Sequence, residues 1–108
     1  TNVEDSAPVY SPDGNWIAFG RRQLIEAQWT PGKQLWIMKS NGTDAKAITN
    51  EALYNHSAFA WSPNGNFLIY MRFNVADFIN PSEIWMVNAD GSGRKKLITG
   101  GYLPQWLP

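Results

Sequence analysis

Short apolar runs separated by turn residues cover the whole chain. The segments Trp16 to Phe19 and Ile84 to Val87 are apolar at every position, a pattern typical of strands that are buried on both faces. No stretch of ten residues keeps the 3.6-residue spacing of an amphipathic helix, because turn residues interrupt every run. The pattern predicts an all-β chain whose sheets are covered by neighbours on both sides.

The runs form an internal repeat. Pro8 to Phe19 recurs as Phe59 to Tyr70 at an offset of 51 residues, and Gln34 to Gly42 recurs as Glu83 to Gly91 at an offset of 49. The terminal segment from Pro104 matches the start of the first copy and begins a third. A repeat of about 50 residues is typical of propellers and similar arrays.

Each copy predicts four antiparallel strands, A to D, joined by tight turns such as Ser-Pro-Asp-Gly, which tolerates the positive φ of a short hairpin. We expect blade one at about residues 6–50, blade two at about 57–100, and the start of blade three at 101–108. The predicted strands are Ala7–Tyr10, Trp16–Arg21, Leu35–Lys39 and Ala45–Thr49, then Ala58–Trp61, Phe67–Arg72, Ile84–Asn88 and Lys95–Thr99. The repeated Trp36 and Trp85 are expected in the blade core.

The repeated motif Pro-x-Tyr/Trp-Ser-Pro-Asp/Asn-Gly, followed by an apolar strand and x-Leu/Ile-Trp-x-Met/Val, resembles the TolB-type propeller repeat. This repeat occurs in the C-terminal domain of TolB, in tricorn-type proteases and in the propellers of prolyl-oligopeptidase-like enzymes. WD-type repeats would carry Gly-His and Trp-Asp dipeptides, which this sequence lacks, and kelch repeats would carry a Gly-Gly pair in each blade. The resemblance implies a partial β-propeller over residues 1–108.

Composition excludes several partners and cofactors. Nine Lys plus Arg balance nine Asp plus Glu, and the basic residues are scattered, so we expect neither a nucleic-acid nor an anionic-membrane surface. The chain has no cysteine, and its apolar runs are far too short to span a membrane. No residues have metal-ligand spacing, and the polar N-terminus is not a signal peptide. We therefore expect no metal, no cofactor and no membrane insertion.

Candidate chemistry gathers on the loops that do not repeat. Strand direction places the B–C and D–A loops at one end of the blades and the short turns at the other. Variable loops on a rigid scaffold often carry function, and we expect these to form either a binding face or local packing. The candidate residues are Arg21, Leu24, Trp29, Tyr54, His56, Arg72 and Phe78.

Two of these residue types have a second interpretation. Arg21 and Arg72 are equivalent in the repeat; they form either a carboxylate-binding ring or ion pairs with Asp5, Glu51 or Asp77. The only histidine, His56, is expected in the D–A loop. No Gly-x-Ser-x-Gly elbow accompanies it, so we expect no catalytic residues.

The resulting hypothesis is a non-catalytic module that binds a protein or peptide through its long loops. The TolB resemblance implies a bacterial periplasmic or extracellular adaptor. The alternatives are a gating propeller of a serine peptidase and a carbohydrate-binding propeller. Two blades cannot close a ring. We therefore expect that several copies form a homo-oligomer that completes one ring, that the chain is part of a larger protein, or that neighbours cover the open faces.

Overall fold

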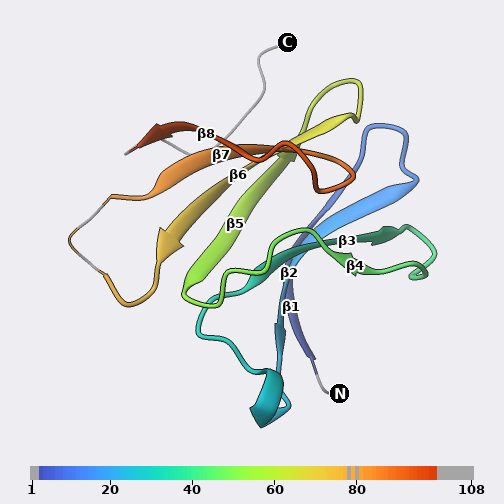
Figure 1. The fold of residues 1–108 in the computed structure, drawn as a ribbon. Helices are drawn as coiled ribbons and strands as arrows, with labels where there is room; N and C mark the ends of the chain where they lie inside the picture. The colour runs from blue at the N-terminus through green and yellow to red at the C-terminus, as the bar shows by residue number, and fades with distance from the viewer. Residues whose placement is uncertain (1–2, 78, 80, 100–108) are drawn as a thin grey trace.

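The computed structural model describes residues 3–77, 79 and 81–99, and these residues form two four-stranded antiparallel sheets of the same topology. Figure 1 shows the sheets side by side, with the N-terminal half forming one and the C-terminal half the other. The strands of the first sheet are β1 (Val3–Tyr10), β2 (Trp16–Gln23), β3 (Gln34–Lys39) and β4 (Lys46–Ala47), and those of the second are β5 (Tyr54–Trp61), β6 (Phe67–Asn74), β7 (Glu83–Asn88) and β8 (Lys95–Thr99). The all-β fold of two blades is confirmed; the expected start of blade three lies outside the described residues.

The tight turn after each first strand is built identically in both copies. The Ser11 hydroxyl donates to Asp13 Oδ1 at 2.6 Å, and the Ser62 hydroxyl donates to Asn64 Oδ1 at 2.7 Å. Gly14 and Gly65 follow, and each has φ of +75°, a conformation that favours glycine. The repeated motif therefore specifies the A–B turn by its own side chains.

The first strand of each sheet is longer than the sequence predicts. β1 begins at Val3 rather than Ala7, and β5 begins at Tyr54 rather than Ala58. Ala7 and Ala58 both have φ of +55°, and the register of pairing shifts around each of them. These are β-bulges, and each bulge lets a polar segment continue the strand beyond the apolar one.

The hydrophobic core lies between the two sheets. Its buried members from the first sheet and the segment after it are Ala18, Leu35, Ile37 and Ile48, and those from the second are Phe59, Trp61, Leu68, Tyr70 and Val87. The repeated tryptophans are only half-buried, so neither belongs to the fully buried core, although Trp85 packs against it. The expectation of blade core therefore holds in part for Trp85 and is corrected for Trp36. The rings of Trp36 and Trp85 also face the guanidinium groups of Arg21 and Arg72.

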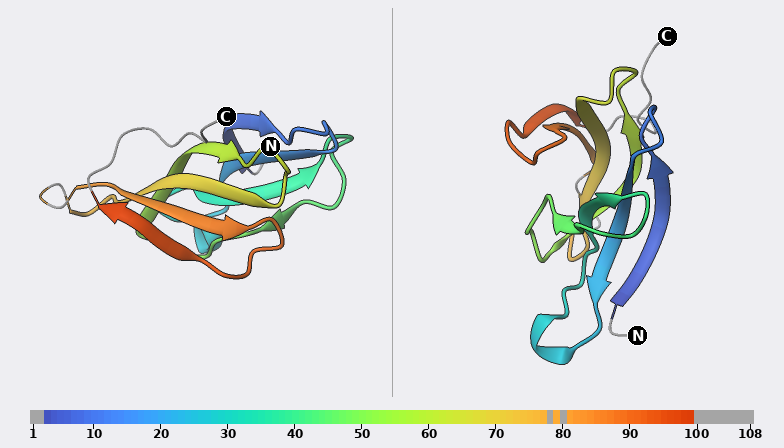
Figure 2. Two further views of the ribbon diagram at one scale, coloured as in Figure 1. Left: turned by 90° about the horizontal axis from the view of Figure 1, so that it is seen from above. Right: turned by 90° about the vertical axis from the view of Figure 1, so that its right-hand side faces the viewer.

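The outermost strand of the first sheet is short. β4 contains two exposed residues, Lys46 and Ala47, where five residues were expected. The chain then turns inward, and Ile48 N donates to Leu35 O at 2.8 Å while the Thr49 hydroxyl accepts from Leu35 N at 3.0 Å. This turn brings the following D–A loop to the end of the blades where the long B–C loops lie (Figure 2).

Candidate functional site

Three loops meet at one end of the two sheets, and we call them the loop face: residues 24–33, 48–53 and 75–82, with residues 78 and 80 outside the description. The middle loop is bonded to both of the others. Gly32 N donates to Ala52 O at 3.0 Å, and Val75 N donates to Leu53 O at 2.8 Å. The D–A loop therefore joins the B–C loops of both blades through main-chain hydrogen bonds.

Gly32 allows the first of these loops to approach β5 closely. A Cβ atom at this position would lie 2.0 Å from the carbonyl oxygen of Tyr54 and 2.8 Å from Asn55 N. Both are main-chain atoms, so no rotation of a side chain could relieve the overlap. Only glycine is compatible with the observed approach of the loop to the strand.

The buried side chain of Gln34 forms hydrogen bonds with the start of the D–A loop. Its amide nitrogen donates to the carbonyl oxygen of Glu51 at 2.8 Å, and its amide oxygen accepts from Glu51 N and from the Thr49 hydroxyl, both at 2.8 Å. Buried polar groups stabilise a structure when all their hydrogen bonds are made. Gln34 thus fixes the start of the D–A loop.

Large apolar side chains are exposed on and beside the loop face: Leu24, Ile25, Trp29, Leu53, Phe73 and Ile79. Trp29 follows a short 3₁₀ helix, Glu26–Gln28, and is 50% exposed. The guanidinium of Arg22 lies 5.9 Å from the centre of its ring, which restrains the ring by a cation–π contact. The Trp29 side chain is therefore exposed, apolar and restrained by its contact with Arg22.

Arg21 forms an ion pair within the first blade. Its Nε and Nη2 donate to the two carboxylate oxygens of Asp5 at 2.8 and 3.0 Å, and its guanidinium stacks on Phe19 and Trp36. The hydrogen bond to Asp5 raises the pKa of Arg21, although partial burial opposes the shift. Of the two interpretations of the repeated arginine, the structure shows the ion pair at this position.

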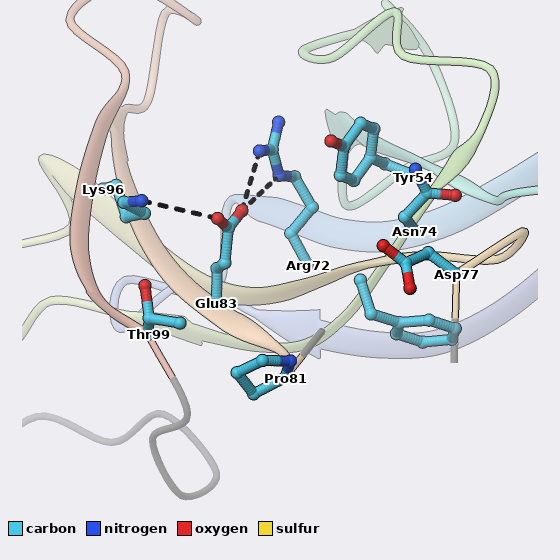
Figure 3. A pocket seen from close by; sticks show the side chains of 9 residues that line it. Tyr54, Arg72, Asn74, Asp77, Pro81, Glu83, Lys96 and Thr99 are labelled. Carbon is cyan, nitrogen blue, oxygen red and sulfur yellow. Dashed lines mark hydrogen bonds and ion pairs between the residues drawn. The ribbon is translucent and has the colours of Figure 1, made fainter. Parts of the chain in front are cut away.

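Arg72 occupies the equivalent position in the second blade but has two acidic partners, of which Figure 3 shows Glu83. It donates to Glu51 at 2.6 Å and to Glu83 at 2.7 and 3.1 Å, and it lies between the rings of Tyr54 and Trp85, 3.8 and 4.3 Å from their centres. Burial disfavours its charge, but the hydrogen bond to Glu83 and the attraction of both carboxylates outweigh it and raise the pKa of Arg72. This arginine connects the D–A loop to β7.

Burial and the arginine act in opposite directions on Glu83. Burial alone would raise the pKa of its carboxyl, but hydrogen bonds from Arg72 and from Trp85, at 3.1 Å, leave it lowered. Lys96 Nζ lies 3.5 Å from the other carboxylate oxygen. The hollow beside these groups has a volume of about 230 Å³, and Figure 3 shows Arg72, Glu83 and Lys96 directed toward one another.

His56 is not in the D–A loop, because β5 begins two residues before it. Its side chain is 1% exposed and lies directly opposite Arg72 in the pairing with β6. Nδ1 is 2.7 Å from Lys33 O, and Nε2 is 2.8 Å from Glu51 Oε1. A buried residue with both ring nitrogens engaged cannot contact a partner directly, so its place on the predicted face is corrected.

The remaining candidates occupy different environments. Leu24 and Trp29 are exposed, Tyr54 is half-buried against Arg72, and Phe78 lies outside the described residues. Sequence reasoning missed Gln34 and Glu83 altogether. The repeat held a signal for the environment of His56: at an offset of 51 it corresponds to Asp5, the partner of the first arginine.

Within residues 3–77, 79 and 81–99, no three His, Cys, Asp or Glu side chains are grouped so that they could hold a metal ion. The same residues contain no helix of the length and apolarity that a membrane crossing requires.

Comparison with solved structures shows the propeller fold. A protein described as a TolB from Agrobacterium tumefaciens superimposes with a TM-score of 0.71 at 23% identity, over 88% of this chain and 33% of that chain. An oligogalacturonate lyase in complex with manganese gives a TM-score of 0.62 at 18% identity, covering 87% of this chain and 24% of that one. A prolyl endopeptidase gives 0.61 at 10% identity, covering 87% and 14%.

Comparison of sequences identifies the family. An uncharacterised protein of Agrobacterium fabrum is 26% identical over 114 residues, which cover 96% of this chain and 36% of that protein. The chain thus spans about a third of the length of this relative. Residues 2–78, more than half of the chain, match the family described as the dipeptidyl peptidase IV (DPP IV) N-terminal region. The chain therefore belongs to the DPP IV N-terminal region family, as a TolB-like propeller fragment of two blades.

Proposed function

We propose that this chain is a non-catalytic part of a β-propeller and that its loop face binds a protein or peptide. The observation that carries the proposal is the group of exposed apolar side chains on the three joined loops, Trp29 above all. Aromatic anchors surrounded by ordered neighbours are typical of binding hot spots. The hydrogen bonds from Gly32 and Val75 to the D–A loop give the face the order that such binding requires.

The internal pairing of the polar groups supports a binding rather than a catalytic role. Both ring nitrogens of His56 and the donors of Arg72 are engaged by neighbouring residues. A general base needs a free position within reach of a substrate proton. The face therefore offers apolar contact area, with its charged groups used to hold the loops in place.

The experiment compares partner recovery by Trp29→Ala and Tyr10→Ala variants. Tyr10 is a matched control because it is also a large exposed aromatic residue, 61% exposed, but it lies at the end of β1 away from the loop face. Trp29→Ala should weaken binding of a captured periplasmic partner about 30-fold or more, the value of a hot-spot residue. Equal recovery by both variants would contradict the proposal.

A second candidate is the propeller of a serine peptidase, which would control access to a separate catalytic domain. The match to the DPP IV N-terminal region over residues 2–78 favours it. An α/β-hydrolase domain with a Gly-x-Ser-x-Gly elbow in the same polypeptide would decide for this candidate. A periplasmic location belongs to the first candidate and rests on the likeness to TolB.

A further inference from the structure

His56 is the only histidine of the chain, and both of its ring nitrogens face hydrogen-bond acceptors. The carbonyl oxygen of Lys33, 2.7 Å from Nδ1, can only accept, so Nδ1 carries a proton. Glu51 Oε1, 2.8 Å from Nε2, belongs to a carboxyl whose other oxygen already accepts from Arg72. The hydrogen bond from His56 and the attraction of Arg72 and Arg94 lower the pKa of Glu51, so this group also acts as an acceptor.

Two acceptors require two donors, and an imidazole ring donates twice only when it is protonated on both nitrogens. The charges around the ring agree with this assignment. Glu51 and Glu83 carry two negative charges, and Arg72 supplies one positive charge among the least exposed groups. An imidazolium at His56 would bring the summed charge of Glu51, Glu83, Arg72 and His56 to zero.

The remaining cations beside these carboxylates are more exposed than Arg72. Lys96 lies 3.5 Å from Glu83, and its side chain is 48% exposed. Arg94 lies 3.6 Å from Glu51 but is 40% exposed. Tyr70, whose ring centre is 5.6 Å from that of His56, is neutral because burial raises its pKa to about 12. The ammonium of Lys33 points away, toward Ser6 and Glu4.

The contacts of His56 hold three parts of the molecule together. Lys33 belongs to the first B–C loop, Glu51 to the D–A loop, and His56 itself to β5. If Nε2 lost its proton, its lone pair would face the Glu51 carboxylate at 2.8 Å, and two acceptors at that distance repel each other. The D–A loop would then lose this side-chain contact to β5, although Tyr54 N, Gln34 and Arg72 would still bind Glu51.

We propose that His56 is a positioning residue that tightens the D–A loop against β5 while doubly protonated and weakens that contact on losing a proton. The loop face is then ordered at lower pH and loosens as the pH rises. At the acidic limit the same contact depends on Glu51: because its pKa in the folded chain is lowered, the contact is present above its ordinary value of 4.5 and is lost as the pH falls through the folded value. Only the consequence for partner binding rests on the proposed function.

The direct test is an NMR titration of the full chain, with the ring nitrogens and the backbone amides followed together. A single histidine gives a single ring signal set, so assignment needs no variant. As the pH is raised across the range in which the chain stays folded, the ring signals should change from doubly to singly protonated. The amides of Gly32 and Val75, which bond to the D–A loop, should shift with the same midpoint.

Two outcomes would overturn the proposal. One is a singly protonated ring at the acidic end while the loop amides already show the bonded state. The other is deprotonation of the ring with no change in those amides. A His56→Gln variant, which does not titrate, should lose the transition of the loop amides, while Glu26→Gln, at an exposed position in the 3₁₀ helix, should keep it. Persistence of the transition in His56→Gln would also overturn the proposal.

Partner capture at the two ends of the same pH range separates this inference from the proposed function. If the loop amides follow His56 and recovery of the partner falls with them, both are supported. If the amides follow His56 and recovery does not change, the switch stands and the loop face is not the binding surface.

Discussion

The two blades place an arginine at the same position and connect it differently. In the first blade, Arg21 binds Asp5 directly across the pair of strands, and Asp5 is 40% exposed. In the second, His56 replaces that acid, and Arg72, whose side chain is 11% exposed, binds Glu51 and Glu83 instead. The first ion pair stays within one sheet, whereas the second connects a sheet to the loop that joins the blades.

The difference shows which part of a repeat carries individual properties. The strand that bears the arginine, the bulge before it and the tryptophan beside it are the same in both blades. The acids that select its connections come from strand and loop positions that do not repeat. The same strand and bulge thus support an ion pair within one sheet in the first blade and an ion pair that holds the loop face in the second.

Gly32→Ala should destabilise the chain more than any other substitution considered below, and it should do so through the first blade alone. The equivalent position of the second blade is Pro81, so only the first blade depends on this close approach. The added Cβ would lie 2.0 Å from Tyr54 O, and we expect a loss of about 3 kcal/mol or more in the free energy of unfolding. Urea denaturation monitored by tryptophan fluorescence measures it.

Gly42→Ala is the matched control for this change. Gly42 has φ of +88° but nothing within 4 Å of an added Cβ, so its cost is conformational strain of about 1 kcal/mol. Equal losses for the two variants would contradict the close contact with Tyr54 as the source of the cost at Gly32.

Substituting each arginine by methionine tests the comparison itself. Methionine keeps an unbranched apolar stem and removes only the charge and its hydrogen bonds. Arg72→Met leaves two largely covered carboxylates with only the more exposed Arg94 and Lys96 as nearby guanidinium and ammonium groups, and it should cost about 2–3 kcal/mol. Arg21→Met leaves only the exposed Asp5 and should cost about 1 kcal/mol. Chemical denaturation of both variants gives the ratio, and a larger loss for Arg21→Met would contradict our account.

Glycine at the two bulges should give the smallest effect and the same one in both blades. Ala7→Gly and Ala58→Gly each relieve a φ of +55°, worth about 1 kcal/mol. The greater freedom of glycine in the unfolded chain offsets most of this gain, so we expect a net stabilisation within about 0.5 kcal/mol. Thermal unfolding would detect it as a small rise in Tm. A clear destabilisation at only one site would mean that the bulges are not equivalent.

The apolar strands and the tight turns were predictable because each depends on residues close in sequence. The turn hydrogen bonds of Ser11 with Asp13 and of Ser62 with Asn64 span two residues. The first halves of β1 and β5 were not predictable in this way. Glu4 and Asp5 carry no apolar pattern, and they are held by pairing with Arg22 and Arg21 across the sheet.

The candidate site was predictable to a similar extent. The exposure of Leu24 and Trp29 followed from their place in long loops. The partners of Arg72 did not, because Glu51 and Glu83 lie 21 and 11 residues away and approach it only once β6 has paired with β5 and β7. The error over His56 came from the same source, since its strand is stabilised by contacts distant in sequence.

The two sheets contribute opposite faces of the repeated unit to the core between them. The first sheet contributes to the core the face that bears Ala18 and Ile37. The second sheet contributes the face that bears Leu68 and Tyr70. In the repeat, Leu68 and Tyr70 correspond to Ile17 and Phe19, which lie on the opposite face of the first sheet. Such an interface is heterologous: each blade presents one kind of surface forward and another backward. A series of blades built on it has no intrinsic end. The rotation from one sheet to the next, rather than any single contact, would therefore decide how many blades complete a circle.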